Sequence, residues 1–360
     1  MKISTPYPWL DLDTVTQNIE RMTRRLEQAG VKHRPHIKTH KSVELARLQL
    51  ELGAKGITCA KLSEAAVMAK AGIKDILVAY PLVGEDKMRR LECLMDIAEV
   101  TVTTDNMVNA VQLNEVGYRR SRPVPVLIEI GAQNQRGGFF SDEKLEAFIK
   151  ELRGLPWIHI KGIFTYVGLR PGLEKPGELE AFAREEAALM EHGKKVAEDA
   201  GACVEEVSAG STATSLFASL HGPITESRAG SYIFNDMNTV NLNAARTEDC
   251  ALKIRTTVVS MPKDGLATVD AGSKSLAADT KPGQGYGRID GYPEIELYKL
   301  NEEHGYLRYD SGKITLKIGQ QLDIIPNHAC VIGNLHDCYF GFRGGKFDRI
   351  IRVDARGKNY

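Results

Sequence analysis

A cluster of basic side chains early in the sequence could supply a reactive amine. The segment RPHIKTHK (34–41) carries five basic residues within eight positions, namely Arg34, His36, Lys38, His40 and Lys41. A lysine that is partly desolvated among other cations has a lowered pKa, and its free amine can attack a carbonyl group. The segment therefore contains a candidate amine nucleophile, unless the whole run is a solvated basic loop.

A histidine and a cysteine near the end of the chain have the spacing of a metal-ligand pair. In the segment PNHACVIGNLHD (326–337), His328 and Cys330 are two positions apart. If the segment is a β-strand, both side chains point to the same face. An imidazole nitrogen and a thiolate sulfur suit zinc, and two protein ligands leave positions for water or substrate. The alternative is a buried cysteine beside an unrelated histidine.

Two runs of small and hydroxyl-bearing residues could bind an anion. They are SAGSTAT (208–214) and RAGSY (228–232). Small residues let backbone N–H groups approach an anion closely, and serine and threonine supply further donors. A third polar run, EIGAQNQRGGFF (129–140), places Arg136 beside a Gly-Gly pair, where a surface arginine is the simpler interpretation.

These candidate residues must be positioned by the first two thirds of the chain, where short apolar runs alternate with amphipathic helices. Helices are predicted over 13–29, 42–52 and 63–72, and strands near 34–37, 56–60, 76–80, 100–104, 124–130, 159–165, 204–208 and 228–234. Eight strands close a parallel βα barrel, whose active-site loops follow the strands. We therefore predict an α/β fold with an eight-stranded βα barrel of the TIM type over 12–240. A doubly wound sheet is disfavoured because no glycine-rich dinucleotide motif follows the first strand.

The sequence pattern changes after about residue 245. The segments ALKIRTTVVSMPKDGLATVD, GKITLKIGQQLDIIP and GKFDRIIRVDARG alternate apolar and polar residues between Gly or Asp turns. This alternation is typical of half-buried strands. We predict an all-β domain over 241–360 that carries His328 and Cys330, with the extended N-terminal segment 1–11 adding a strand.

Composition and charge exclude several classes of protein. Lys plus Arg (47) equals Asp plus Glu (47), so the chain lacks the overall basic charge of a nucleic-acid-binding protein. The sequence contains no apolar run long enough for a membrane span and no signal-peptide h-region at its N-terminus. Six cysteines are scattered through the chain, which fits a reducing compartment. We expect a soluble cytoplasmic protein that binds neither nucleic acid nor membrane.

Taken together, these motifs resemble those of the fold-type III pyridoxal-phosphate enzymes, which share the alanine racemase barrel. Within that group, the sequence is most similar to the D-serine dehydratase and D-threonine aldolase family. The similarity covers essentially the whole chain. It includes the opening TPYPWLDLD, the RPHIKTHK block, the Arg-Gly after the fifth strand, the SAGST and GSY loops, and the His-x-Cys pair.

The resemblance implies a role for each candidate residue. Lys38 matches the lysine that holds pyridoxal phosphate as a Schiff base. Arg136 matches an arginine near the phenolic oxygen of the cofactor, and Tyr166, in the motif FTYVG, is similar to a tyrosine near its pyridine nitrogen. The loops that bind the cofactor phosphate contain Ser211, Thr212, Gly230, Ser231 and Tyr232. The metal pair is His328 and Cys330, for which zinc is expected and manganese or magnesium are alternatives.

The metal pair also bears on the reaction. The dehydratase branch resembles His-x-Cys, whereas the D-threonine aldolase branch resembles His-Cys-Asp with Asp as the second ligand. The sequence His328-Ala329-Cys330 therefore resembles the dehydratase side. The motifs DAGSKSLAAD (270–279) and Glu303-His304-Gly305 occur in both branches and do not distinguish them.

The resemblance implies a lyase that acts on β-hydroxy D-amino acids. A dehydratase eliminates the β-hydroxyl to give a 2-oxo acid and ammonia, whereas an aldolase cleaves the Cα–Cβ bond to give glycine and an aldehyde. Racemisation leaves the metal pair unexplained, and a non-catalytic pyridoxal-phosphate carrier leaves the β domain unexplained. D-serine, D-threonine and 3-hydroxy-D-aspartate all remain open as substrates. The resemblance further implies a homodimer in which the β domain of one chain completes the partner's site.

Overall fold

The computed structural model describes residues 3–280 and 285–360, which divide into two compact units. One unit comprises residues 1–20, 39–44 and 231–357, and we call it the β unit. The other comprises residues 21–38, 45–230 and 358–360, and we call it the barrel unit. Lys38 and Thr39 are consecutive in the chain but belong to different units.

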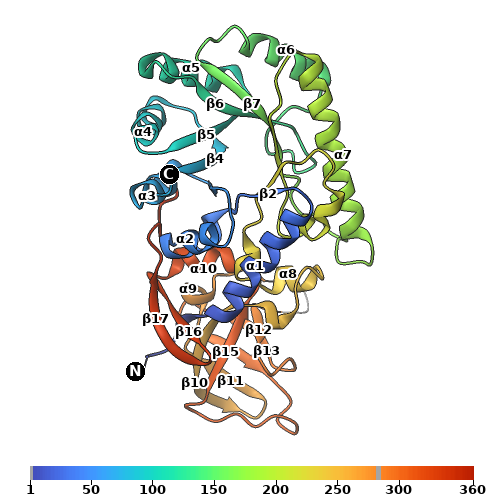
Figure 1. Cartoon of the computed structure of the whole chain (residues 1–360). Coiled ribbons are helices and arrows are strands. Elements are labelled where there is room, and N and C mark those ends of the chain that lie inside the picture. Colours follow the sequence, from blue (N-terminus) through green and yellow to red (C-terminus); the bar gives the residue numbers. More distant parts are fainter. Residues whose placement is uncertain (1–2, 281–284) are drawn as a thin grey trace. The chain divides into compact units, whose positions relative to one another are not determined.

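The barrel unit is built on a sheet of eight parallel strands (Figure 1). Their order in the sheet is β2-β9-β8-β7-β6-β5-β4-β3, and a parallel bridge between His36 and Thr58 joins the two ends of the row. The fold-class prediction of an eight-stranded βα barrel is therefore confirmed. The strands are β2 (Lys32–His33), β3 (Ile57–Cys59), β4 (Asp75–Pro81), β5 (Glu99–Thr104), β6 (Val124–Glu129), β7 (Ile158–Phe164), β8 (Glu206–Ala209) and β9 (Glu226–Ser227).

Two of the eight strands differ from their predicted positions. The predicted first and eighth strands, 34–37 and 228–234, begin after the observed β2 and β9, which are only two residues long. The apolar residues of those segments are buried in two 3-10 turns instead, η1 (Ile37–Thr39) and η3 (Ser231–Ile233). Burial alone does not distinguish a strand from a short turn, so the apolar pattern was misleading there.

Helices follow the strands and cover the outer face of the sheet, as Figure 1 shows for α3 to α7. The first turns of α5 and α6 are fixed by local side chains: Asn106 accepts a hydrogen bond from the Asn109 amide at the start of α5, and Ser141 accepts one from the Lys144 amide at the start of α6. Inside the sheet, Leu77, Leu127 and Phe164 pack together. The helices are α1 (Leu12–Gln28), α2 (Val43–Glu51), α3 (Leu62–Lys70), α4 (Glu85–Met95), α5 (Met107–Arg120), α6 (Asp142–Leu152) and α7 (Glu178–Asp199).

The β unit is built on a nine-stranded sheet. The strands β11-β14-β13-β12-β15-β10 form a row that the pairing of β10 with β11 closes into a six-stranded barrel. Strand β1 pairs with β10 on one side and β16 on the other, and β17 forms the edge. The all-β prediction is thus confirmed. The strands are β1 (Tyr7–Asp11), β10 (Leu252–Lys263), β11 (Leu266–Val269), β12 (Gly287–Ile289), β13 (Glu296–Leu300), β14 (Gly305–Arg308), β15 (Gln321–Pro326), β16 (Cys338–Arg343) and β17 (Lys346–Arg352).

Short helices complete the β unit, namely α8 (Met237–Asn241), α9 (Ser273–Leu276) and α10 (Ala329–Leu335), with a further 3-10 turn, η4 (Thr247–Asp249). Among the residues that the structure describes, no helix combines the length and the apolar character that crossing a bilayer requires.

Candidate functional site

Lys38 lies in the 3-10 turn η1, which follows β2 at the carboxyl end of the barrel strands. Its side chain is exposed, and its Nζ atom lies 5.8 Å from the centre of the Tyr166 ring. Tyr166 follows β7 by two residues, so it belongs to the same end of the sheet. The structure therefore brings together two of the residues that the sequence places at the cofactor.

Arg136 joins this cluster from the loop that follows β6. Its guanidinium carbon lies 5.2 Å from the centre of the Tyr166 ring, and its Nη2 atom lies 3.9 Å from Oε1 of Glu129. Burial raises the pKa of Glu129, and the charge of Arg136 opposes that rise. Lys38 and Arg136 thus place two cations near one aromatic ring, an arrangement that suits an anionic aromatic ligand.

His36 lies among these cations. Burial and the positive charges of Lys38 and Arg228 hold the pKa of His36 well below its usual range, so this imidazole is neutral near pH 7. Its Nδ1 atom accepts a 3.4 Å hydrogen bond from the backbone N–H of Lys38. His36 therefore contacts the backbone of the candidate nucleophile without adding charge to the site.

The first predicted phosphate loop follows β8 directly. The Ser211 amide donates to Oγ1 of Thr214 (2.9 Å), and Thr212 is buried beside it. Gly210 has φ +82°, and a Cβ there would come within 2.6 Å of the Ser227 hydroxyl. Only glycine fits this close approach. The loop also brings small residues and hydroxyl groups together, and this composition suits the binding of a phosphate group.

The second predicted loop follows β9. The Arg228 amide donates to the carbonyl of Ala209 (3.1 Å), so this loop runs beside the first at the same end of the sheet. Gly230 is half-buried and is the last residue of the barrel unit in this stretch. Ser231 and Tyr232 open the turn η3 of the β unit, where Ser231 is half-buried and Tyr232 is buried.

Arg228 is a site residue that the sequence reasoning missed. Its guanidinium is buried, donates to the hydroxyl of Ser208 (2.7 Å) and to the carbonyl of Thr165, and lies 4.4 Å from the centre of the Phe164 ring. Burial lowers the pKa of Arg228 to about 10, so it remains a cation at neutral pH. Because Thr165 precedes Tyr166, this buried cation fixes the backbone beneath the Lys38 cluster.

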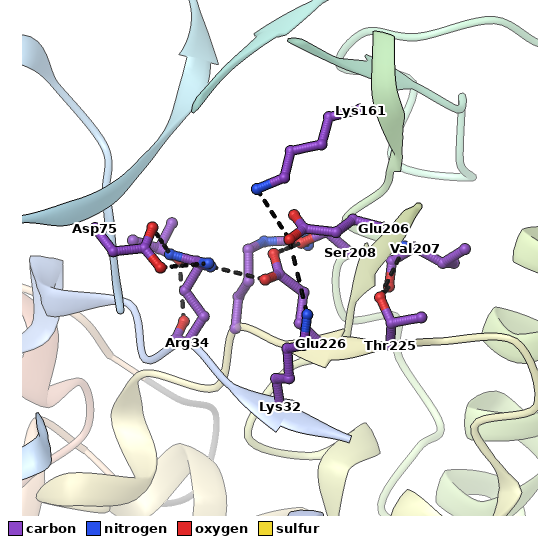
Figure 2. A network of polar contacts seen from close by, with 11 residues as sticks. Lys32, Arg34, Asp75, Lys161, Glu206, Val207, Ser208, Thr225 and Glu226 are labelled. Atoms are coloured by element: carbon purple, nitrogen blue, oxygen red, sulfur yellow. Dashed lines mark hydrogen bonds and ion pairs between the residues drawn. The ribbon is translucent and has the colours of Figure 1, made fainter. Parts of the chain in front are cut away.

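Ser208, which accepts from Arg228, begins a ladder of polar contacts that continues through Glu226 and Arg34 to Asp75 (Figure 2). The Ser208 hydroxyl donates a hydrogen bond to one carboxylate oxygen of Glu226 (2.6 Å), and the Arg34 Nε donates to the other (2.7 Å). The two terminal nitrogens of the Arg34 guanidinium donate to the carboxylate of Asp75 (2.6 and 3.0 Å). Burial alone would lower the pKa of Arg34, but Glu226 and Asp75 raise it. Burial alone would raise the pKa of Glu226, but Arg34 lowers it.

The structure overturns the predicted strand around the candidate metal pair. His328 is the residue before helix α10, and Cys330 lies in its first turn, so the two are not alternate residues of a strand. The helix begins there because the Ala329 amide donates to Asp236 (2.9 Å), a long-range cap that no local sequence pattern reveals. Asp236 is buried, and burial raises its pKa.

The two side chains nevertheless converge. A hydrogen bond between the His328 imidazole and the Cys330 thiol raises the pKa of His328 to about 9. The Thr39 hydroxyl contacts the Cys330 sulfur at 3.1 Å, and Asp279 lies 3.7 Å from Nδ1 of His328. A nitrogen and a sulfur donor at the start of one helix suit a zinc-like ion. Within residues 3–280 and 285–360, no three His, Cys, Asp or Glu side chains group around one metal position.

Comparison with known proteins assigns the family. The family model described as alanine racemase, N-terminal domain, matches residues 10–238, and the model described as putative serine dehydratase domain matches residues 251–342. The chain thus has the class of fold and site that defines the alanine racemase-like enzymes. It belongs to the D-serine dehydratase and D-threonine aldolase family of pyridoxal-phosphate-dependent lyases that act on D-amino acids.

Three relatives illustrate the similarity. A 3-hydroxy-D-aspartate aldolase of Paracoccus denitrificans is 33% identical over 100% of this chain and 94% of its own. A D-threo-3-hydroxyaspartate dehydratase of Delftia sp. is 33% identical over 94% of both chains. The crystal structure of a D-threonine aldolase from Filomicrobium marinum superimposes with a TM-score of 0.92 at 28% identity, covering 99% of this chain and 97% of the other.

Proposed function

We propose that this protein is a pyridoxal-phosphate- and metal-dependent dehydratase of β-hydroxy D-amino acids, of the D-serine dehydratase type. The reaction eliminates the β-hydroxyl and yields a 2-oxo acid and ammonia. The placement of His328 and Cys330 at the start of α10 carries the proposal, because this donor pair can hold a Lewis-acidic ion. Bound pyridoxal phosphate supplies an electron sink for negative charge at Cα, and a bound metal makes hydroxide a better leaving group.

The segment 12–240 supplies the residues for the cofactor. Lys38 would hold it, and the Lys38 Nζ would accept the proton from Cα of the substrate. Arg136 binds the phenolic oxygen, and Tyr166, held near both cations, lies by the pyridine ring. The phosphate is bound by Ser211, Thr212, Gly230, Ser231 and Tyr232. We assign these functions to a barrel domain over 12–240.

The β domain over 241–360, with the strand 1–11, supplies the metal site. His328 and Cys330 hold the ion, and zinc suits this nitrogen and sulfur pair. The chain itself links this pair to the nucleophile, because Thr39, which contacts the Cys330 sulfur, is the residue after Lys38. An ion held there would be available to the substrate's β-hydroxyl as a Lewis acid.

A named relative supports dehydration. Solved structures named D-threo-3-hydroxyaspartate dehydratase include one variant with a histidine replaced by alanine and another, in a metal-free form, with a cysteine replaced by alanine. The two replaced residues are two positions apart, as His328 and Cys330 are. The same donor pair at the same spacing in a dehydratase favours elimination for this chain.

Aldol cleavage is the second candidate. The Paracoccus relative and the Filomicrobium structure are both named aldolases, and the second superimposes with a TM-score of 0.92. The same residues would serve this reaction if the substrate's β-hydroxyl lost its proton and the Cα–Cβ bond broke. The products are then glycine and an aldehyde.

The proposal is tested by assaying ammonia and 2-oxo acid release from D-serine, D-threonine and 3-hydroxy-D-aspartate. Activity should disappear after chelation and return with zinc or manganese. Lys38→Ala should lose the visible absorbance of the lysine-bound cofactor as well as activity. Full activity in metal-free buffer would contradict the role of the metal pair, and a retained absorbance band in Lys38→Ala would contradict the role of Lys38.

A further inference from the structure

A cavity of about 430 Å³ lies in the barrel unit, between the segment that follows β6 and one face of α7. This volume is in the range of small-molecule sites. One wall is formed by residues of α7 that lie on the same face of the helix, because they are three or four positions apart. The lining residues are Gly131, Ala132, Gln133, Gln135, Phe140, Val167, Phe182, Glu185, Glu186 and Leu189. None of the residues assigned above to the cofactor or the metal is among them.

The lining combines aromatic rings with carboxylates. The Phe140 ring packs against Gly131, where a Cβ would come within 2.7 Å of it, and Phe182 faces the cavity from α7. Among the described residues that line the cavity there are two glutamates and no lysine or arginine. Aromatic faces and carboxylates together are the groups that bind organic cations.

One cation of the chain already uses part of this surface. The Arg170 guanidinium carbon lies 5.0 Å from the centre of the Phe182 ring, and its fork donates to both oxygens of Glu185 (2.7 and 2.9 Å). The charge of Glu185 is neutralised by this ion pair. Glu186 is therefore the carboxyl group of the lining that can bind a second cation.

Glu186 is 1% exposed, and its two oxygens differ. Oε1 accepts a hydrogen bond from the Gly210 amide (3.3 Å). Oε2 is covered and has no hydrogen-bond partner within the described part of the chain. Burial raises the pKa of Glu186, which a hydrogen bond with Thr214 and the charge of Arg228 oppose. A buried carboxyl oxygen without a donor is costly, and a ligand cation beside it would relieve that cost.

We propose that this cavity is a second small-molecule site, which binds a small organic ammonium ion between Glu186 and the rings of Phe140 and Phe182. The cationic head lies beside the Glu186 carboxyl, and the apolar part of the ligand contacts the rings, Val167 and Leu189. The site is independent of the proposed lyase reaction.

Choline is the probe, because its quaternary nitrogen cannot form an imine with the cofactor. Its uncharged counterpart is 3,3-dimethylbutanol, which has the same shape. Isothermal titration of the cofactor-loaded protein should show millimolar or tighter binding of choline and at least tenfold weaker binding of the alcohol. Absence of choline binding at tens of millimolar, or equal binding of the two compounds, would overturn the proposal.

Substitutions in the cavity test whether choline binds there. Glu186→Gln keeps the shape of the side chain and should weaken choline binding at least fivefold. Glu180→Gln is the matched control, since Glu180 lies on α7 outside the cavity, paired with Arg184 at 2.9 Å. If Glu186→Gln fails to fold, Leu189→Phe should fill the cavity and abolish binding. Unchanged choline affinity in the folded variant would show that the cation binds elsewhere.

Discussion

The Lys38 amine lies 5.8 Å from the centre of the Tyr166 ring, and the Arg136 guanidinium approaches the same ring at 5.2 Å. Tyr166 therefore organises two cations that come from different strands of the barrel. An exposed cation–π contact contributes about 0.5–1 kcal/mol, which is a factor of roughly two to five in affinity.

Tyr166→Leu should accordingly weaken cofactor binding by about fivefold, through the loss of the ring. Tyr166→Phe keeps the ring and separates its contribution from that of the hydroxyl. Cofactor titration followed by absorbance measures both variants. Wild-type affinity in Tyr166→Leu would show that the ring does not organise the site.

Replacement of Cys330 should remove the metal and leave the cofactor. We expect Cys330→Ser to lose at least about 100-fold in activity, because the Lewis acid is worth several kcal/mol. Metal content by mass spectrometry should fall while cofactor absorbance stays. Cys338→Ser, at a half-buried cysteine in β16, is the control and should keep its metal. Equal metal content in the two variants would contradict the assignment.

The ladder beneath the site should matter for stability. Glu226→Gln removes the buried charged partner of Arg34, leaves only the more exposed Asp75, and should lower the free energy of unfolding by about 3 kcal/mol. Glu206→Gln is the matched change in the neighbouring network of Figure 2. There the carboxylate pairs with Lys161 at 3.0 Å and Lys32 at 4.0 Å, and both lysines are more exposed than Arg34. We expect a loss of about 1 kcal/mol there. Urea unfolding measures the free energy of unfolding of both variants. Equal losses in the two would contradict a stabilising role for the ladder.

Acid sensitivity should follow from the buried His33. Burial lowers the pKa of His33 to about 3, so the folded state keeps it neutral while the unfolded state takes up a proton below about pH 6.5. The stabilisation is therefore complete above pH 6.5 and is lost as pH falls toward 3, by up to about 1.4 kcal/mol per pH unit. His33→Gln should flatten this part of the stability curve. An unchanged slope in urea titrations between pH 4 and 6.5 would contradict the prediction.

The sequence predicted the fold because its signals are local. Apolar runs that alternate with amphipathic helices indicate βα units, and the hairpin of β10 and β11 follows from alternation around Asp264-Gly265. The two-residue strands β2 and β9 could not be located, because they are held by neighbouring strands and not by their own pattern.

The candidate site was predictable in part. Lys38 and Arg136 could be proposed because each follows a strand, and the structure places both near Tyr166. The buried Arg228 was missed because its partners, Ser208 and Thr165, are 20 and 63 residues away in the chain. The available signal was the arginine that opens the segment RAGSY (228–232), whose burial only the structure shows. The helix at the metal pair depends on Asp236, which is 93 residues from Ala329 in the chain, so no local pattern could reveal it.

Incubation of the purified protein with D-threonine and zinc or manganese, followed by identification of the products, tests the proposed reaction most directly. This one substrate distinguishes elimination from aldol cleavage. The account predicts 2-oxobutyrate and ammonia. Glycine and acetaldehyde would contradict it, and would show that the His328 and Cys330 pair does not determine which bond breaks.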